Sequence, residues 1–121
     1  MPNDTILVVD DSPTEQRVVV SALQAKGYRV ITAADGDEAI EKAGREQPRL
    51  IVLDVVMPKK NGYQVCRQLK SAPETQHIKV LMLTTKNQDA DKFWGMKQGA
   101  DAYLTKPFAS DELITNVTRL Y

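Results

Sequence analysis

The chain has 121 residues and a formal net charge of zero, with 16 basic and 16 acidic residues. This length fits one domain, and the balanced charge excludes a long-range field that would attract nucleic acid or an acidic membrane. The single cysteine excludes an internal disulfide framework, and no apolar run is long enough to span a bilayer. Residues 1–5 lead into the first apolar run without the features of a signal peptide. We therefore expect a soluble, cytoplasmic protein.

Short apolar runs alternate with longer segments of helical periodicity, a pattern that predicts repeated βα units and a parallel sheet. The five expected strands are Thr5–Val9, Arg29–Ala33, Leu50–Leu53, Lys79–Leu83 and Asp101–Leu104. The first, third and fourth runs are almost wholly apolar, which indicates burial on both faces of the sheet. Right-handed crossovers then place helices on both faces.

The expected helix boundaries carry their own chemistry. Ser12 is typical of an N-cap, Pro13 suits the first helical position, and Glu15 completes a capping box. Asp35 and Glu38 repeat the box for the second helix. The later helices are expected to begin at Asn61-Gly62, about Asp89 and near Ser110, and the first four end at Gly27, before Pro48, at Ala72-Pro73 and at Gly99.

Polar residues follow four of the expected strands at the point where each apolar run ends. They are Asp10 and Asp11 after the first strand, Asp54 after the third, Thr84 after the fourth and Lys106 just past the fifth. The carboxyl ends of parallel strands share one edge of the sheet, where open α/β folds bind their ligands. We therefore expect these five side chains to converge on one site.

This combination of groups predicts phosphoryl chemistry. Carboxylates held close together require a cation, and oxygen ligands favour Mg²⁺. No His or Cys lies near these motifs, which argues against zinc. Asp10 and Asp11 are placed as a metal-binding pair, so Asp54 is the best nucleophile for an aspartyl phosphate. Lys106 would supply positive charge and Thr84 a hydrogen bond to the transferring group.

The sequence resembles the receiver domains of bacterial two-component response regulators, in particular the single-domain chemotaxis type. The matching elements are Val9-Asp10-Asp11, Asp54 with Met57-Pro58 and Asn61-Gly62, Thr84, Gly99-Ala100, Tyr103 and Lys106-Pro107. A narrower likeness, to regulators of twitching motility and phototaxis, lies in Ser12-Pro13-Thr14-Glu15, Val56-Met57-Pro58, Thr84-Thr85-Lys86 and Tyr103-Leu104-Thr105-Lys106-Pro107. The resemblance implies a flavodoxin-like α/β fold with strand order 2-1-3-4-5. It also implies one receiver domain over residues 1–121, without an output domain.

The resemblance assigns roles to the site residues. It implies that Asp54 accepts phosphate from a phosphohistidine on a histidine kinase. Mg²⁺ would be bound by Asp11, Asp54 and the backbone carbonyl of Val56, with Asp10 acting largely through water. Thr84 and Lys106 would contact the phosphoryl group. By the same analogy, the peptide bond between Lys106 and Pro107 is a candidate for the cis form.

The resemblance also implies how a signal leaves the site. Tyr103 matches an aromatic switch position and would turn inward as Thr84 moves toward the phosphate. This movement would remodel the face of the fourth helix, fifth strand and fifth helix, where a downstream protein would bind. Val56 and Lys86 lie where family members vary, and an apolar Val56 predicts slow self-dephosphorylation. We expect a monomer or weak dimer that catalyses its own phosphorylation without being a conventional enzyme.

Four other functions compete with this interpretation. A flavodoxin-like electron carrier would need a phosphate-binding first loop, but that loop has no glycine, and Asp10 and Asp11 would repel phosphate. An aspartate-nucleophile phosphatase usually has a second acid two residues after the nucleophile, where this chain has Val56. A pseudo-receiver that binds partners without phosphorylation, and a receiver that serves only as a phosphate sink, are the other two.

The expected fourth helix carries a cluster of large apolar side chains. Phe93 is expected to pack in the core, whereas Trp94 fits either the core or a partner-docking surface. Gly95 lowers helix stability by about 1 kcal/mol relative to alanine, which predicts a mobile helix. Cys66 is expected to be a small buried hydrophobe on the third helix, and His77 lies in a surface loop without an assigned role.

Overall fold

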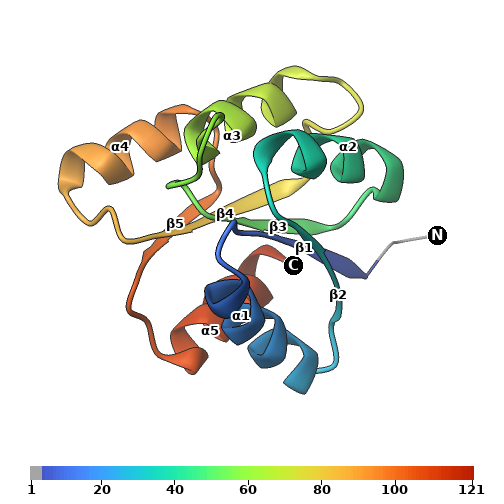
Figure 1. Ribbon diagram of the computed structural model, residues 1–121, viewed down its shortest axis with the longest axis vertical. Coiled ribbons are helices and arrows are strands. Elements are labelled where there is room, and N and C mark those ends of the chain that lie inside the picture. The colour runs from blue at the N-terminus through green and yellow to red at the C-terminus, as the bar shows by residue number, and fades with distance from the viewer. Residues whose placement is uncertain (1–3) are drawn as a thin grey trace.

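The computed structural model describes residues 4–121 as a five-stranded parallel sheet with helices on both faces (Figure 1). The strands are β1 (Thr5–Val9), β2 (Arg29–Ala33), β3 (Leu50–Leu53), β4 (Lys79–Thr84) and β5 (Ala102–Thr105), in the order β2-β1-β3-β4-β5. The predicted order is confirmed. Residues 1–3, on which the expected absence of a signal peptide partly depends, lie outside the described residues.

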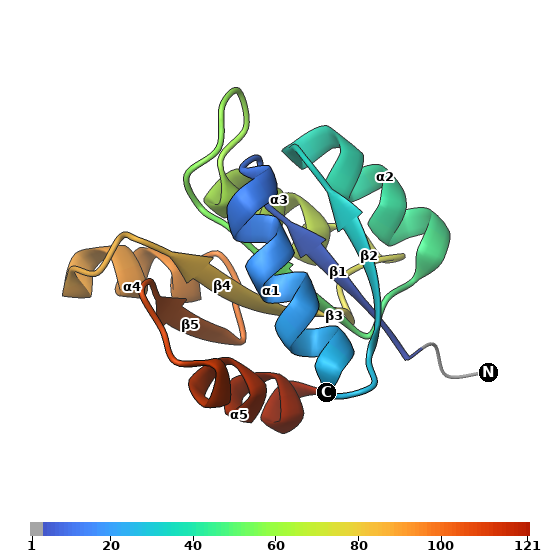
Figure 2. The same ribbon diagram turned by 60° about the horizontal axis from the view of Figure 1, so that its bottom comes forward.

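Five helices connect the strands. They are α1 (Pro13–Ala25), α2 (Gly36–Glu46), α3 (Gly62–Ser71), α4 (Asp89–Lys97) and α5 (Ser110–Leu120). Helices α2, α3 and α4 cover one face of the sheet, and α1 and α5 cover the other (Figures 1 and 2). Within residues 4–121, every helix is too short or too polar to cross a membrane.

The core consists of two layers because successive strand residues point to opposite faces. Leu7 and Val9 pack with residues of α2 and α3, whereas Ile6 and Val8 pack with α1 and α5. Strands β1 and β3 are buried along their whole length, and β4 is buried after its first residue. Burial on both faces is therefore confirmed for the three central strands.

The N-cap residues of the first two helices are confirmed, but the capping boxes differ from the prediction. Ser12 Oγ accepts a hydrogen bond from the backbone N–H of Glu15 at 3.3 Å. The Glu15 carboxylate does not return this bond, because the Ser12 N–H donates to Asp10 Oδ1 at 2.9 Å and Glu15 instead binds Lys106. In α2, the Glu38 carboxylate bonds the N–H of Ala34, one residue before the N-cap Asp35.

The prediction that Phe93 packs in the core is wrong. Phe93 is 66% exposed, and Trp94 and Met96 are also exposed, at 50% and 41%. The residue of α4 that faces the sheet is Gly95, the one buried residue of this helix. A Cβ added at Gly95 would lie 2.9 Å from both Met82 Sδ and the Tyr103 ring. The glycine lets α4 approach the sheet closely, and this contact turns the aromatic residues outward.

Candidate functional site

The register of the sheet brings the predicted site residues to one rim. The N–H of Asp10 donates to the carbonyl of Ala33 at 3.1 Å, and the N–H of Asp54 donates to the carbonyl of Val9 at 3.0 Å. On the other side of the rim, the Lys106 N–H donates to the Thr84 carbonyl at 2.7 Å. These bonds continue the ladder past the strand ends, so the side chains are positioned by the sheet itself.

Three carboxylates meet at this rim. One oxygen from each of Asp10, Asp11 and Asp54 lies within 4.8 Å of the others. Asp10 and Asp54 are buried, with exposures of 4% and 7%, whereas Asp11 is exposed to solvent. A cluster of oxygen ligands with one open side fits a hard divalent cation such as Mg²⁺, which uses few carboxylates and retains water.

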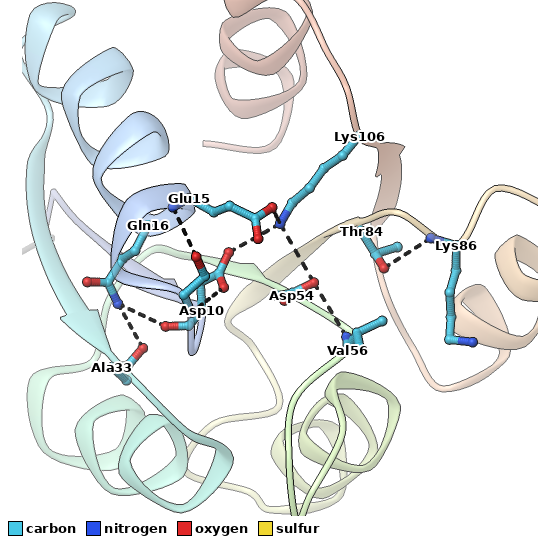
Figure 3. Close-up of polar contacts among 10 residues, drawn as sticks. Asp10, Glu15, Gln16, Ala33, Asp54, Val56, Thr84, Lys86 and Lys106 are labelled. Atoms are coloured by element: carbon cyan, nitrogen blue, oxygen red, sulfur yellow. Dashed lines mark hydrogen bonds and ion pairs between the residues drawn. The ribbon is translucent and has the colours of Figure 1, made fainter.

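Lys106 lies at the centre of the acidic group (Figure 3). Its Nζ is 3.2 Å from Asp10 Oδ2, 2.8 Å from Glu15 Oε1 and 3.9 Å from Asp54 Oδ1. Burial disfavours the charged form, but the hydrogen bond to Glu15 and the charges of Asp54 and Asp10 outweigh it and raise the pKa of Lys106. The ammonium therefore stays charged. The Lys106-Pro107 peptide bond is cis, as the resemblance implies.

Burial disfavours the ionised form of the Asp54 carboxyl group. Burial raises its pKa from 3.8 to about 6; Lys106 opposes this rise, and the charge of Asp10 adds to it. The backbone N–H of Val56 gives the carboxylate one weak hydrogen bond, at 3.4 Å. Without a further cation, Asp54 would be half protonated at about pH 6, and a bound cation would favour the ionised, nucleophilic form.

Thr84 and Tyr103 both bind the backbone of Lys86, at the start of the loop between β4 and α4. The N–H of Lys86 donates to Thr84 Oγ1 at 3.3 Å, and the Tyr103 hydroxyl donates to the Lys86 carbonyl at 2.9 Å. Thr84 is fully buried and Tyr103 is partly buried. A movement of either side chain would therefore disturb a residue that the other one holds.

Glu15 and Gln16 are two site residues that the sequence interpretation missed. Glu15 shares Lys106 with the acidic cluster, and Gln16 Nε2 donates to the carbonyls of Asp10 and Ala33, at 3.2 and 3.1 Å (Figure 3). Both residues lie in the first turn of α1, where an acidic or polar side chain is ordinary. Only their position one turn after Asp10 and Asp11 indicates that they face the rim.

Comparison with known proteins identifies the family. A family model described as "Response regulator receiver domain" matches residues 6–118 of the chain. Protein PilH of Pseudomonas aeruginosa is 43% identical over 112 residues, which cover 93% of each chain. The crystallised chemotaxis protein CheY4 of Vibrio cholerae superimposes with a TM-score of 0.90 at 35% identity, covering 97% of this chain and 98% of that one. The chain therefore belongs to the response regulator receiver domain family and is a signalling domain of two-component systems.

Other relatives are longer proteins. The alkaline phosphatase synthesis transcriptional regulatory protein PhoP of Bacillus subtilis is 46% identical over 115 residues, which cover 95% of this chain but 47% of PhoP. The chain thus spans nearly all of PilH and about half of PhoP. Similarity to PhoP extends only to its receiver portion and carries no inference about the remainder of that protein.

Proposed function

We propose that Asp54 accepts a phosphoryl group from a phosphohistidine of a histidine kinase in a Mg²⁺-dependent reaction. The observation that carries this proposal is the buried Asp54 carboxylate between two further carboxylates, with Lys106 Nζ 3.9 Å away. Three buried or converging acids are costly in a structural role, but they suit a site that takes up a cation and a phosphoryl group.

In the proposed reaction, an oxygen of ionised Asp54 attacks phosphorus and forms the acyl phosphate bond. The bond between phosphorus and the histidine nitrogen breaks, and its electron pair returns to the imidazole. Lys106 stabilises the added negative charge, while the hydroxyl of buried Thr84 donates a hydrogen bond to a phosphoryl oxygen. Asp11, Asp54 and the backbone carbonyl of Val56 would hold Mg²⁺, with Asp10 acting largely through water, and the bound ion would supply further positive charge to the phosphoryl oxygens.

The proposed switch follows from the shared contacts of Lys86. When Thr84 Oγ1 turns toward a phosphoryl oxygen, the Lys86 N–H loses its 3.3 Å bond, and the Tyr103 hydroxyl holds the other end of the same residue. Phosphorylation would therefore shift the loop that leads into α4, together with Tyr103 on β5. We propose that a downstream protein reads this change on the face of α4, β5 and α5.

A pocket beside the rim offers a surface for the phosphate donor. It has a volume of about 330 Å³ and is lined by Glu15, Val18, Val19, Thr85, Lys106 and Pro107, among others. Val18 is 59% exposed although it is a large apolar residue. An apolar wall that ends at Lys106 would let a kinase dock on α1 with its phosphohistidine directed toward Asp54.

We further propose a stand-alone receiver with a role in motility or taxis. The chain spans 93% of PilH, and the chemotaxis protein CheY4 matches it over nearly its full length. The narrower motif likeness to twitching-motility and phototaxis regulators supports the same pathway. Use of the domain as a phosphate sink is the second candidate, because a receiver without a bound target would still drain phosphate from its kinase.

Intact mass spectrometry tests the phosphoacceptor directly. The protein is incubated with Mg²⁺ and acetyl phosphate, in parallel with Asp54→Asn and with Asp111→Asn, an exposed aspartate of α5 as matched control. We expect one added phosphoryl group on the parent chain and on Asp111→Asn, none on Asp54→Asn, and none when EDTA replaces Mg²⁺. An adduct that persists in Asp54→Asn would disprove the assignment.

This experiment and three further measurements separate the alternatives. No adduct on the parent chain would favour a pseudo-receiver, and repeated turnover of a phosphomonoester would favour a phosphatase. If kinase-supplied phosphate is lost without any change at α4, β5 or α5 in NMR spectra, the phosphate-sink function is favoured. Because Val56 cannot orient a hydrolytic water by hydrogen bonding, we expect slow loss of the phosphoryl group; a half-life of seconds would contradict this.

A further inference from the structure

Exposed apolar side chains gather on α4. Within residues 4–121, the large apolar residues with high exposure are Val18, Val56, Phe93, Trp94 and Met96. The first two flank the acidic rim, and the other three lie on this one short helix. Trp94 lines a pocket of about 390 Å³ between α3 and α4, together with Arg67, Lys70, Ser71, Lys97 and Gln98.

The charges around this pocket have one sign. No carboxylate lines it, and of its three cations only Lys70 has an acidic partner, Asp101 at 3.0 Å. Within the described chain, neither Arg67 nor Lys97 makes an ion pair, and Lys97 Nζ lies 5.8 Å from the centroid of the Phe93 ring. Helix α2 differs, because its Lys42 and Arg45 each pair with a glutamate of the same helix. Two unneutralised cations therefore flank a half-exposed indole ring.

We propose that this α3–α4 pocket binds an acidic segment of a partner protein, with a large apolar side chain on Trp94 and carboxylates on Arg67 and Lys97. An aromatic ring between unpaired cations is complementary to such a segment in both shape and charge. Nucleic acid is a poorer occupant, because the chain has no net positive charge and the pocket offers one aromatic ring. The pocket lies on the α3 side of α4, outside the α4, β5 and α5 face.

The pocket is tested separately from phosphoryl transfer. None of its lining residues belongs to the acidic rim, so the Asp54→Asn variant should bind a test peptide as the parent chain does. Trp94 is the only tryptophan of the chain, and its fluorescence therefore reports on this pocket without any label.

Three nine-residue peptides serve as probes. The first has a central Leu-Phe pair flanked by glutamates, the second replaces the glutamates with lysines, and the third replaces Leu-Phe with Ser-Ser. We expect saturable quenching or a blue shift of Trp94 emission with the first peptide. The dissociation constants of the other two peptides should be at least tenfold larger. Each of the substitutions Arg67→Glu and Lys97→Glu should weaken binding of the first peptide at least tenfold. Lys92→Glu makes the same charge change on α4 outside the pocket and should weaken binding of this peptide less than twofold.

Several results would overturn the proposal. These are absence of saturation by the acidic apolar peptide, equal binding of the lysine peptide, or an equal loss in Lys92→Glu. Tighter binding of a single-stranded DNA oligonucleotide than of the acidic peptide would assign the surface to nucleic acid. A concentration-dependent dimer in sedimentation, abolished by Trp94→Ala, would assign it to a second copy of the chain. Circular dichroism of each variant separates loss of binding from loss of fold.

Discussion

The acidic rim and helix α4 are joined by the short loop that follows Thr84 but are held in different ways. At the rim, buried charged groups are fixed by ladder hydrogen bonds and by Lys106, which contacts three carboxylates. Helix α4 buries only Gly95 and is tied by the Tyr63 hydroxyl, which donates to the Asp91 carbonyl at 3.1 Å. Five residues of α3 are buried by comparison. The rim therefore holds its charges in fixed positions, whereas α4 has few buried contacts with the rest of the fold.

Removal of the central cation should have the largest effect on the rim. We expect Lys106→Met to lower the free energy of unfolding by about 3 kcal/mol at pH 8, because it leaves buried carboxylates without their counter-charge. The loss should shrink at pH 5, where Asp54 is largely protonated, and in the presence of millimolar Mg²⁺. Urea denaturation with and without EDTA measures this. The control Lys97→Met, on α4, should change stability by less than about 0.5 kcal/mol.

Removal of the nucleophile's charge should stabilise the fold. The folded-state pKa of Asp54 is raised to about 6, so ionisation costs stability as the pH rises from about 4 to about 6, and the cost is complete above that range. We expect Asp54→Asn to gain about 2 kcal/mol at pH 8 in EDTA, with the gain vanishing near pH 4. Urea unfolding at a series of pH values tests this, and a gain that does not depend on pH would contradict it.

Two glycine substitutions compare the position where α4 contacts the sheet with an open position on the surface of another helix. Gly95→Ala should destabilise the protein by about 1–2 kcal/mol, since its Cβ would meet Met82 and Tyr103, which outweighs the better helix propensity of alanine. A Cβ added at Gly44 in α2 would meet no other side chain or neighbouring element within 4 Å, so Gly44→Ala should stabilise the protein by about 0.5–1 kcal/mol. Thermal unfolding of both variants tests this. A stabilising Gly95→Ala would show that α4 does not rest on the Tyr103 ring.

The smallest effect is expected on the outer side of α4. Phe93→Ala should change stability by no more than about 0.5 kcal/mol, because the ring is largely exposed. Leu69→Ala on α3, where the side chain is buried, should cost about 2–5 kcal/mol. Chemical denaturation of the two variants shows whether Phe93 is exposed, as in the structure, or lies in the core, as the sequence alone suggests.

The sequence alone determined the fold class and placed four of the site residues at one rim of the sheet. Short apolar runs define the strands, and the three central ones are buried on both faces. The polar residue that ends such a run must lie at the shared rim of a parallel sheet. Asp10, Asp54, Thr84 and Lys106 could therefore be placed before any contact was known. The N-caps Ser12 and Asp35 were equally predictable, because capping is a contact between residues three apart in the chain.

Tertiary structure alone decided which group binds which. Glu15 leaves its expected capping bond because Lys106, 91 residues away in the chain, lies 2.8 Å from its carboxylate. Phe93 faces solvent because Gly95, with no side chain, is the residue of α4 that can approach Tyr103. A short helix with aromatic residues on several sides does not specify which side is buried. The sheet beneath it makes that choice through the space available to one Cβ atom.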